Sequence, residues 1–161
     1  MDQRIIDSPV GCLLLGAQEG KLVQVRLIND EEKHCDFLGT DPVLEMAQEQ
    51  IAQYFAGERA EFDLPIVMQG TAFECALWQQ LVKIPFGETT NYGNLANILG
   101  KPSASRAVGR ACSRNPLLIV VPCHRVVAAS GRLTGFSGGM EAKRSLLILE
   151  GHTIEKDKLI K

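Results

Sequence analysis

The sequence lacks any long apolar run and any segment typical of an export signal. No stretch of its 161 residues approaches the ~18 consecutive apolar residues of a membrane span. The opening segment, MDQRIIDSPVG, has neither the basic region nor the apolar run of a signal peptide. We therefore expect a cytoplasmic protein with no membrane partner.

Paired cysteines are also missing. The sequence holds five cysteines, which is an odd number, and no two of them have CxxC spacing. This pattern favours free thiols over a disulfide framework. His34 and Cys35 have no compactly spaced partner pair, so the sequence predicts no metal site, and we expect no cofactor. The cysteines are Cys12, Cys35, Cys75, Cys112 and Cys123.

The net charge of −2 conceals two halves of opposite sign. Residues 1–69 carry 5 Lys/Arg and 13 Asp/Glu, whereas residues 70–161 carry 12 Lys/Arg and 6 Asp/Glu. A basic half favours a polyanionic partner, although two ordinary solvated surfaces explain the counts equally well.

Residues 1–69 are predicted to form a small α/β support domain without a catalytic constellation. Strands near 12–15 and 22–27, joined at Glu19-Gly20, indicate a hairpin. Asp41-Pro42 opens a helix that packs on the hairpin through residues including Val43 and Met46. Residues 61–68 are expected to be extended.

Residues 70–161 are predicted to begin with helices. One runs from Thr71 to about Ile84-Pro85, and Asn91 caps a short helix that ends before Gly100. Ser103 is expected to cap a second short helix over 104–113, which gives a helix-turn-helix. This last helix carries a stripe of arginines at 106, 110 and 114 that favours nucleic-acid contact, although a solvated face is the simpler alternative.

The chemistry centres on the segment LLIVVPCHR. The apolar run 117–121 predicts a buried strand that Pro122 ends, with Cys123, His124 and Arg125 directly after it. His124 is a candidate base for the thiol. Neighbouring residues of a strand point to opposite faces, so either the chain turns sharply after Pro122 or a water relays the proton. A buried structural cysteine beside a hydrogen-bonded histidine remains the alternative.

The C-terminal segment supplies a loop and one more helix. The Gly-rich loop 128–139 allows close backbone approach to a ligand, and a helix is expected over 140–150. Glu150 opposes the dipole of this helix, so we predict that it orients His124, with Glu141 as the only other acid available. The tail to Lys161 is expected to be polar and mobile.

These motifs together resemble the O6-alkylguanine-DNA alkyltransferase family over residues 70–151. The matching segments are PCHRV at 122–126, SRAVG at 105–109, Asn115-Pro116, IPFG followed by NY, TGFSGG, and Glu150-Gly151. Residues 1–69 resemble the family's ribonuclease-H-like N-terminal domain. The resemblance implies an α+β fold, with a mainly helical, winged-helix-like C-terminal domain over 70–161 that carries the helix-turn-helix.

The resemblance implies DNA repair by direct reversal, in which a monomer flips O6-methylguanine out of duplex DNA through the minor groove. The sequence leaves open whether O4-methylthymine is a further substrate. Cys123 accepts the alkyl group once, and His124, Glu150, Asn115 and Tyr92 assist. The residues implied at the base pocket are Ser137, Val126, Gly135 and Phe136, and those at the DNA are Arg106, which fills the gap in the base stack, Ser103, Ala104, Gly109, Arg110 and Arg114.

The sequence departs from the family at three of these positions. Arg110 and Arg114 stand where many members carry small residues, and Phe136 stands where tyrosine is common. The rival interpretations are a non-catalytic alkylated-DNA-binding protein of the same fold, a Cys-His-Glu hydrolase and a plain DNA-binding regulator. Cys123 argues against the first, because that group replaces the acceptor cysteine.

Overall fold

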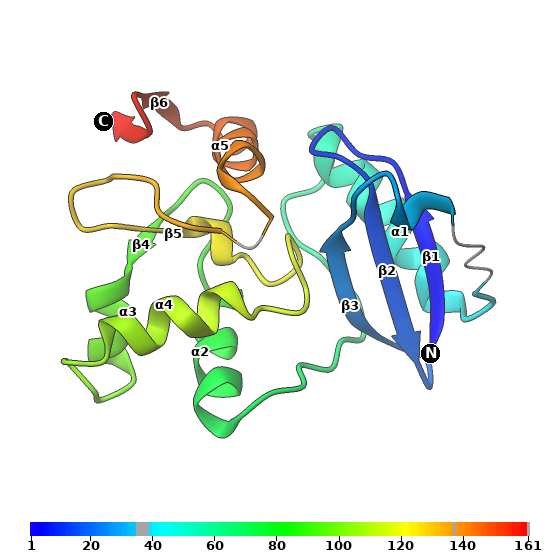
Figure 1. Cartoon of the computed structure of the whole chain (residues 1–161), viewed down its shortest axis with the longest axis horizontal. Coiled ribbons are helices and arrows are strands. Elements are labelled where there is room, and N and C mark those ends of the chain that lie inside the picture. Colours follow the sequence, from blue (N-terminus) through cyan, green and yellow to red (C-terminus); the bar gives the residue numbers. More distant parts are fainter. Residues whose placement is uncertain (35–38, 137, 161) are drawn as a thin grey trace. The chain divides into compact units, whose positions relative to one another are not determined.

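The computed structural model describes residues 1–34, 39–136 and 138–160 (Figure 1). The chain divides into two compact units. The N-terminal unit comprises Met1–Gln69 and Pro116–Val120, and the C-terminal unit comprises Gly70–Asn115 and Val121–Lys161. A short piece from the middle of the second half of the sequence therefore belongs to the N-terminal unit.

The N-terminal unit is built on an antiparallel sheet with the order β1-β2-β3. The strands are β1 (Asp2–Ile6), β2 (Leu13–Gln18) and β3 (Lys21–Leu27), and the predicted hairpin of β2 and β3 is confirmed. Glu19 and Gly20 form its turn, both with positive φ. Strand β1 was not predicted from the sequence, and a 3₁₀ turn, η1 (Glu32–His34), follows β3.

Helix α1 (Pro42–Phe55) lies against this sheet, as Figure 1 shows. Asp41 caps it by accepting a hydrogen bond from the backbone N–H of Val43, as predicted. The expectation that Met46 faces the sheet is wrong, because its side chain is 42% exposed and Leu44 is buried instead. The predicted extended piece at 61–68 contributes only one parallel bridge, between Ile66 and Leu22.

The predicted strand at 117–121 is wrong. Only Leu117 bridges β3, through Val25, and the chain then turns, with the Val120 N–H donating to the Leu118 carbonyl at 2.8 Å. Ile119, at the centre of this turn, has a φ of 71°, which is strained for a β-branched residue. All five residues are nevertheless buried, so the apolar run reflected burial rather than strand geometry.

The C-terminal unit begins with three helices: α2 (Ala72–Val82), α3 (Tyr92–Ile98) and α4 (Ser105–Ser113). Thr71 and Glu74 form a capping box at the start of α2, and Asn91 caps α3 as predicted. The buried indole of Trp78 donates a hydrogen bond to the Ala111 carbonyl at 2.9 Å, which ties α2 to α4.

Two expectations about α4 are wrong. Ser103 does not cap this helix, because Ala104 occupies the N-cap position and makes no side-chain hydrogen bond there. Arg114 is the C-cap residue, so only Arg106 and Arg110 of the predicted stripe lie on the helix itself. The turn between α3 and α4 contains Gly100 with a φ of 73°, as a tight connection requires.

The remaining elements surround the segment that carries Cys123. A 3₁₀ turn, η2 (Cys123–Arg125), leads into β5 (Val126–Val127), which pairs in parallel with β4 (Thr90–Asn91). Helix α5 (Met140–Leu149) follows the Gly-rich loop.

The prediction of a mobile tail is wrong, because the tail forms a hairpin of β6 (Thr153–Glu155) and β7 (Lys158–Ile160). The hairpin contributes to a small core, in which Ile154 and Leu159 pack against Val127, Leu133 and Leu147.

Candidate active site

Cys123 lies at a sharp turn of the chain. Pro122 (φ −82°, ψ 64°) forms an inverse γ-turn in which the Cys123 N–H donates to the Val121 carbonyl at 2.8 Å. The chain then enters η2, so the structure has the turn after Pro122 that the sequence left as one of two alternatives. The Cys123 residue is only 3% exposed.

Asn115 holds the sulfur of Cys123 in place. Its side-chain Nδ2 donates to the Sγ of Cys123 at 3.2 Å and to the Val121 carbonyl at 2.7 Å. A hydrogen bond of this kind favours the thiolate over the thiol, because it stabilises negative charge on sulfur.

His124, Arg125 and Glu150 form a buried cluster of ionisable side chains next to the cysteine in the sequence and at the end of α5. The Glu150 carboxylate lies 2.7 Å from Nε2 of His124 and accepts two hydrogen bonds from Arg125, at 2.8 and 3.0 Å. Arg125 also donates to the Ile84 carbonyl at 2.6 Å. These contacts supply the reason for an acid at the unfavourable end of α5, and they agree with the predicted pairing of Glu150 with His124.

The two ring nitrogens of His124 have different environments. A carboxylate only accepts hydrogen bonds, so Nε2 carries the proton toward Glu150 and Nδ1 keeps its lone pair. Nδ1 is buried and has no hydrogen-bond partner among the described residues. Burial also lowers the pKa of His124, which favours the neutral imidazole, although Glu150 acts in the opposite direction.

Burial dominates the titration of Cys123 as well. It raises the pKa of this thiol to about 11, while the hydrogen bond from Asn115 and the positive charge of Lys143 act to lower it. Without a base, the thiolate is therefore a minor form at neutral pH. A neutral histidine with a free lone pair close by in the sequence is the group that such a thiol needs.

Lys143 is a site residue that the sequence analysis missed. Its side chain is almost fully buried, and Nζ donates to the carbonyls of Val126 at 2.6 Å and Thr134 at 3.3 Å. Burial lowers its pKa. A sequence signal existed, because Lys143 lies three and four residues before Leu146 and Leu147, which places a charge on the apolar face of α5.

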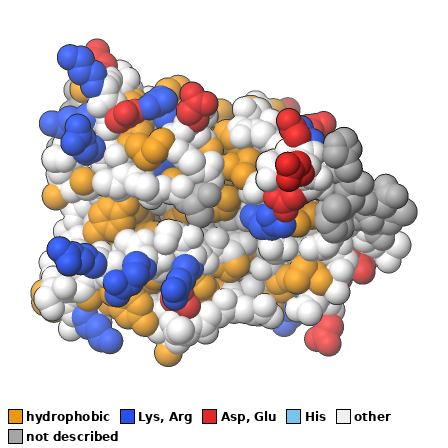
Figure 2. Space-filling model, in the orientation of Figure 1, with side chains coloured by type: hydrophobic (Ala, Val, Ile, Leu, Met, Phe, Trp, Pro, Cys, Tyr) orange, Lys and Arg blue, Asp and Glu red, His pale blue; other side chains and the backbone are white. Residues whose placement is uncertain are grey.

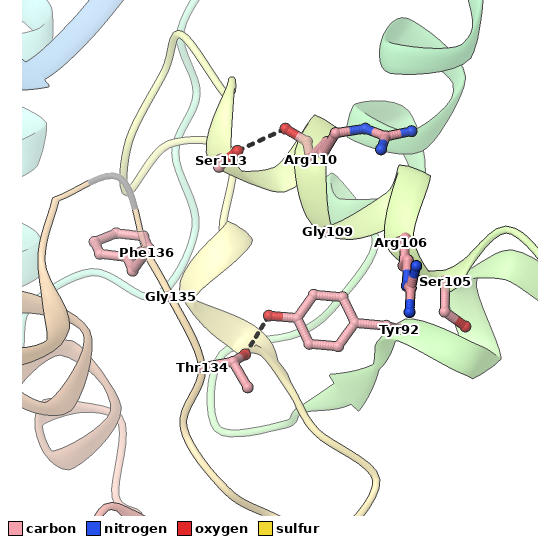
Figure 3. A pocket seen from close by; sticks show the side chains of 9 residues that line it. All are labelled: Tyr92, Ser105, Arg106, Gly109, Arg110, Ser113, Thr134, Gly135 and Phe136. Carbon is pink, nitrogen blue, oxygen red and sulfur yellow. Dashed lines mark hydrogen bonds between the residues drawn. The ribbon is translucent and has the colours of Figure 1, made fainter.

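A groove of about 790 Å³ lies on the C-terminal unit between α4 and the Gly-rich loop (Figure 3). The Tyr92 ring crosses it, and its hydroxyl hydrogen-bonds to the hydroxyl of Thr134 (Figure 3). Burial raises the pKa of Tyr92, so this phenol stays protonated at neutral pH. The groove is lined by Tyr92, Ser105, Arg106, Gly109, Arg110, Ser113, Thr134, Gly135 and Phe136.

The structure divides the predicted site residues into groups. Six of them line the groove: Tyr92, Arg106, Gly109, Arg110, Gly135 and Phe136. Four more are buried around the Cys123 turn: Cys123, His124, Glu150 and Asn115. Four residues line neither part: Ser103, Ala104, Arg114 and Val126.

Arg114 lies within 3.6 Å of the Glu74 carboxylate instead of lining the groove. Ser137 lies outside the described residues. The groove also includes three residues that the sequence analysis did not single out, namely Ser105, Ser113 and Thr134.

The described residues contain neither a cluster of metal ligands nor a membrane-spanning helix. Within 1–34, 39–136 and 138–160, no three His, Cys, Asp or Glu side chains gather as a metal site would require. Over the same ranges, no helix has the length and apolar character needed to cross a bilayer.

Comparison with known proteins places this geometry in one class of protein. Residues 1–68 match the model of the 6-O-methylguanine DNA methyltransferase ribonuclease-like domain, and residues 72–152 match that of the DNA-binding domain of the same family. Together the two models cover most of the chain, with a boundary between them near residue 70.

Individual relatives agree with the family models. The chain is 42% identical over 152 residues to a methylated-DNA–protein-cysteine methyltransferase of Mycolicibacterium paratuberculosis, covering 93% of this chain and 92% of that protein. The crystal structure of the Mycobacterium tuberculosis O6-methylguanine methyltransferase superposes with a TM-score of 0.81 at 43% identity, over 92% of this chain and 91% of that one. The Mycobacterium tuberculosis OGT in complex with DNA gives 0.83 at 44% identity, with the same coverage.

The chain belongs to the 6-O-methylguanine DNA methyltransferase family. The predicted family and the predicted two-domain architecture, a ribonuclease-like domain followed by a DNA-binding domain, are both confirmed. The relatives assign the chain to DNA repair by transfer of an alkyl group to a protein cysteine, and they include a structure with bound DNA.

Proposed function

We propose that Cys123 is the residue that accepts the alkyl group, and that the substrate is O6-alkylguanine in duplex DNA. The environment of Cys123 carries the assignment. Its sulfur accepts a hydrogen bond from Asn115, and the next residue, His124, is oriented by the buried carboxylate of Glu150. Of the described cysteines, this is the one that the structure equips in this way.

The transfer is a single in-line displacement. The sulfur of Cys123 forms a bond to the alkyl carbon as the bond from that carbon to O6 of guanine breaks. The thiol proton moves to Nδ1 of His124, directly or through a water, and Glu150 stabilises the imidazolium that results. The departing guanine requires a proton or a strong hydrogen bond, which the protonated phenol of Tyr92 supplies together with Ser137.

The groove receives the DNA in this proposal. Helix α4 enters the minor groove of the DNA. The small residue Gly109 permits close contact there, and Arg110 contacts the DNA backbone. Arg106 takes the space that the flipped nucleotide leaves in the base stack. Flipping costs a few kcal/mol of unstacking, which this replacement and the contacts in the pocket offset.

The product is a thioether, which has no hydrolytic route back to the thiol. Each molecule therefore acts once and is consumed. We further propose that the protein works as a cytoplasmic monomer, with residues 1–69 as a support domain and residues 70–161 carrying both DNA binding and chemistry.

The test is mass spectrometry of the protein after incubation with a duplex that contains O6-methylguanine. We expect one added methyl group per molecule, on the peptide that contains Cys123, and loss of the lesion. Cys123→Ser should leave the lesion intact. Cys112→Ser is the matched control, because Cys112 is another buried thiol of the same unit, and it should still be methylated at Cys123.

The proposed role of Arg106 in base flipping is tested by comparing two arginine variants on duplex DNA and on the free base. Arg106→Ala should slow repair of duplex DNA much more than transfer from the free base, whereas Arg114→Ala, which changes an arginine outside the groove, should have a smaller effect. Equal losses on duplex and free base for Arg106→Ala would remove its role in flipping. An unmodified Cys123 peptide beside intact lesion would overturn the proposed function as a whole.

A further inference from the structure

A second basic surface lies on the C-terminal unit, outside the groove. Arg132, Lys156 and Lys158 are all exposed, and with Ser130 they line a shallow pocket of about 510 Å³. We call these four residues the hairpin cluster. The same pocket is also lined by Glu155 and Ile160.

The backbone fixes the positions of these side chains. The segment that carries Arg132 pairs with β7, through an antiparallel bridge between Arg132 and Lys158. Two hydrogen bonds flank the bridge: Leu133 N–H to the Asp157 carbonyl at 2.7 Å, and Leu159 N–H to the Gly131 carbonyl at 2.9 Å. The loop and the C-terminal hairpin therefore present their cations together rather than independently.

The hairpin cluster carries positive charge that no ion pair of the described residues neutralises. None of its three cations has an ion-pair partner among the described residues, and Glu155 is the one acid that lines the pocket. The neighbouring Asp157 is already paired with Arg144. Like charges held close together repel, so an anion that binds between them gains the full benefit of neutralising them.

One short stretch of chain joins the hairpin cluster to the groove. Arg132 lines the pocket and Thr134 lines the groove, while Leu133 between them is buried. Figure 2 shows Lys and Arg side chains over α4 and a second group near the C-terminal end of the chain, with uncharged and hydrophobic surface between them. A duplex that rests on α4 and extends over this surface would bring its phosphates to both basic regions.

We infer that the hairpin cluster binds backbone phosphates of the same duplex that enters the groove, and so extends the DNA contact beyond the helix-turn-helix. This inference rests on the proposed function. Phosphate is the expected ligand because two ammonium groups, one guanidinium and one hydroxyl line the pocket without an aromatic side chain, and these hydrogen-bond donors suit an anion and not a base.

The experiment measures duplex affinity as a function of salt concentration for the full chain. The test variant is Arg132→Gln/Lys156→Gln/Lys158→Gln, and a single-charge comparison sets Lys158→Gln against Lys21→Gln. Lys21 is an exposed lysine of the N-terminal unit and is the matched control. All four proteins are also assayed for alkyl transfer from a free O6-alkylguanine base.

The slope of log affinity against log salt should become shallower by about 0.9 for each lost phosphate contact, and affinity near 0.1 M salt should fall roughly tenfold per contact. Lys21→Gln should match the wild type. Free-base transfer should not change, because the hairpin cluster touches neither Cys123 nor the groove.

Two results would overturn the inference. One is a triple variant with the slope and affinity of the wild type. The other is a loss of free-base transfer as large as the loss of duplex affinity, which would assign these residues to folding. Both differ from failure of the proposed function, in which the wild-type protein itself would leave the duplex lesion intact.

Discussion

Replacing Glu150 by glutamine should destabilise the C-terminal unit strongly. The Glu150 carboxylate is fully buried and compensates the guanidinium of Arg125, whose side chain is only 7% exposed, through two hydrogen bonds of 2.8 and 3.0 Å. Removing one member of a buried ion pair leaves the other charge uncompensated, which costs about 3–5 kcal/mol. For a chain of this size each kcal/mol lowers Tm by about 2–4 °C, so we expect a drop of roughly 6–20 °C.

The chain offers a probe and a control for this measurement. Trp78 is the sole tryptophan, and it is buried in the C-terminal unit, so its fluorescence during urea unfolding reports on that unit. Glu141→Gln is the matched control, because it changes an exposed acid at the other end of α5 and should cost less than about 0.5 kcal/mol.

A double-mutant cycle separates charge compensation from lost packing. Arg125→Met removes the guanidinium but keeps most of the side-chain volume. If charge compensation dominates, the double variant with Glu150→Gln should lose less stability than the two single variants added together, by about 0.5–3 kcal/mol. A loss for Glu150→Gln no larger than that of Glu141→Gln would refute the reasoning.

Two further predictions concern the titrating groups. Lys143→Met should slow alkyl transfer to Cys123 from duplex and from free base alike, because Lys143 acts to lower the pKa of Cys123. A thiol pKa that is one unit higher corresponds to a rate on the order of tenfold lower. Single-turnover rates measure this effect, and an unchanged rate would contradict it. Burial lowers the pKa of His124 below its unfolded value of about 6.5, so the unfolded chain binds a proton that the folded chain does not, and stability should fall as pH drops below ~6.5, by up to about 1.4 kcal/mol per pH unit. Urea unfolding at pH 5 to 7 should show a shallower dependence for His124→Gln, and an identical dependence would exclude His124 as its source.

Local capping chemistry made the helix starts predictable from the sequence. Asp41 and Asn91 accept the backbone hydrogen bonds that their residue types favour at helix N-termini. The same rule wrongly predicted Ser103 as the cap of α4. This helix begins at Ser105, after a turn in which the Ala104 N–H donates to the Lys101 carbonyl. A capping residue can be recognised in a sequence, but the turn that decides whether the cap is used depends on packing.

The wrong predictions for residues 117–121 and for the C-terminal tail relied on amino-acid composition instead of on the order of apolar and polar residues. The apolar run 117–121 was interpreted as a strand, although such a run reports burial and does not distinguish strand from turn. The tail was interpreted as mobile because it is polar, although Ile154 and Leu159 stand either side of a turn at Lys156 and Asp157 and alternate with polar residues. That alternation is the stronger signal for a hairpin.

The sequence motifs predicted the residues of the candidate site, but they did not predict how deeply Cys123 is buried. The motifs identified Cys123, His124 and Glu150, yet no spacing rule shows that Cys123 is 3% exposed and lies outside the lining of the groove. This separation constrains the proposed function. In the proposed function, a base that stays stacked in a duplex on the groove would not reach the buried sulfur, so the proposed transfer requires the base to leave the helix. In the same proposal, Tyr92 would exchange its hydrogen bond to Thr134 for one to the incoming guanine, so that entry of the base and activation of the leaving group would occur together.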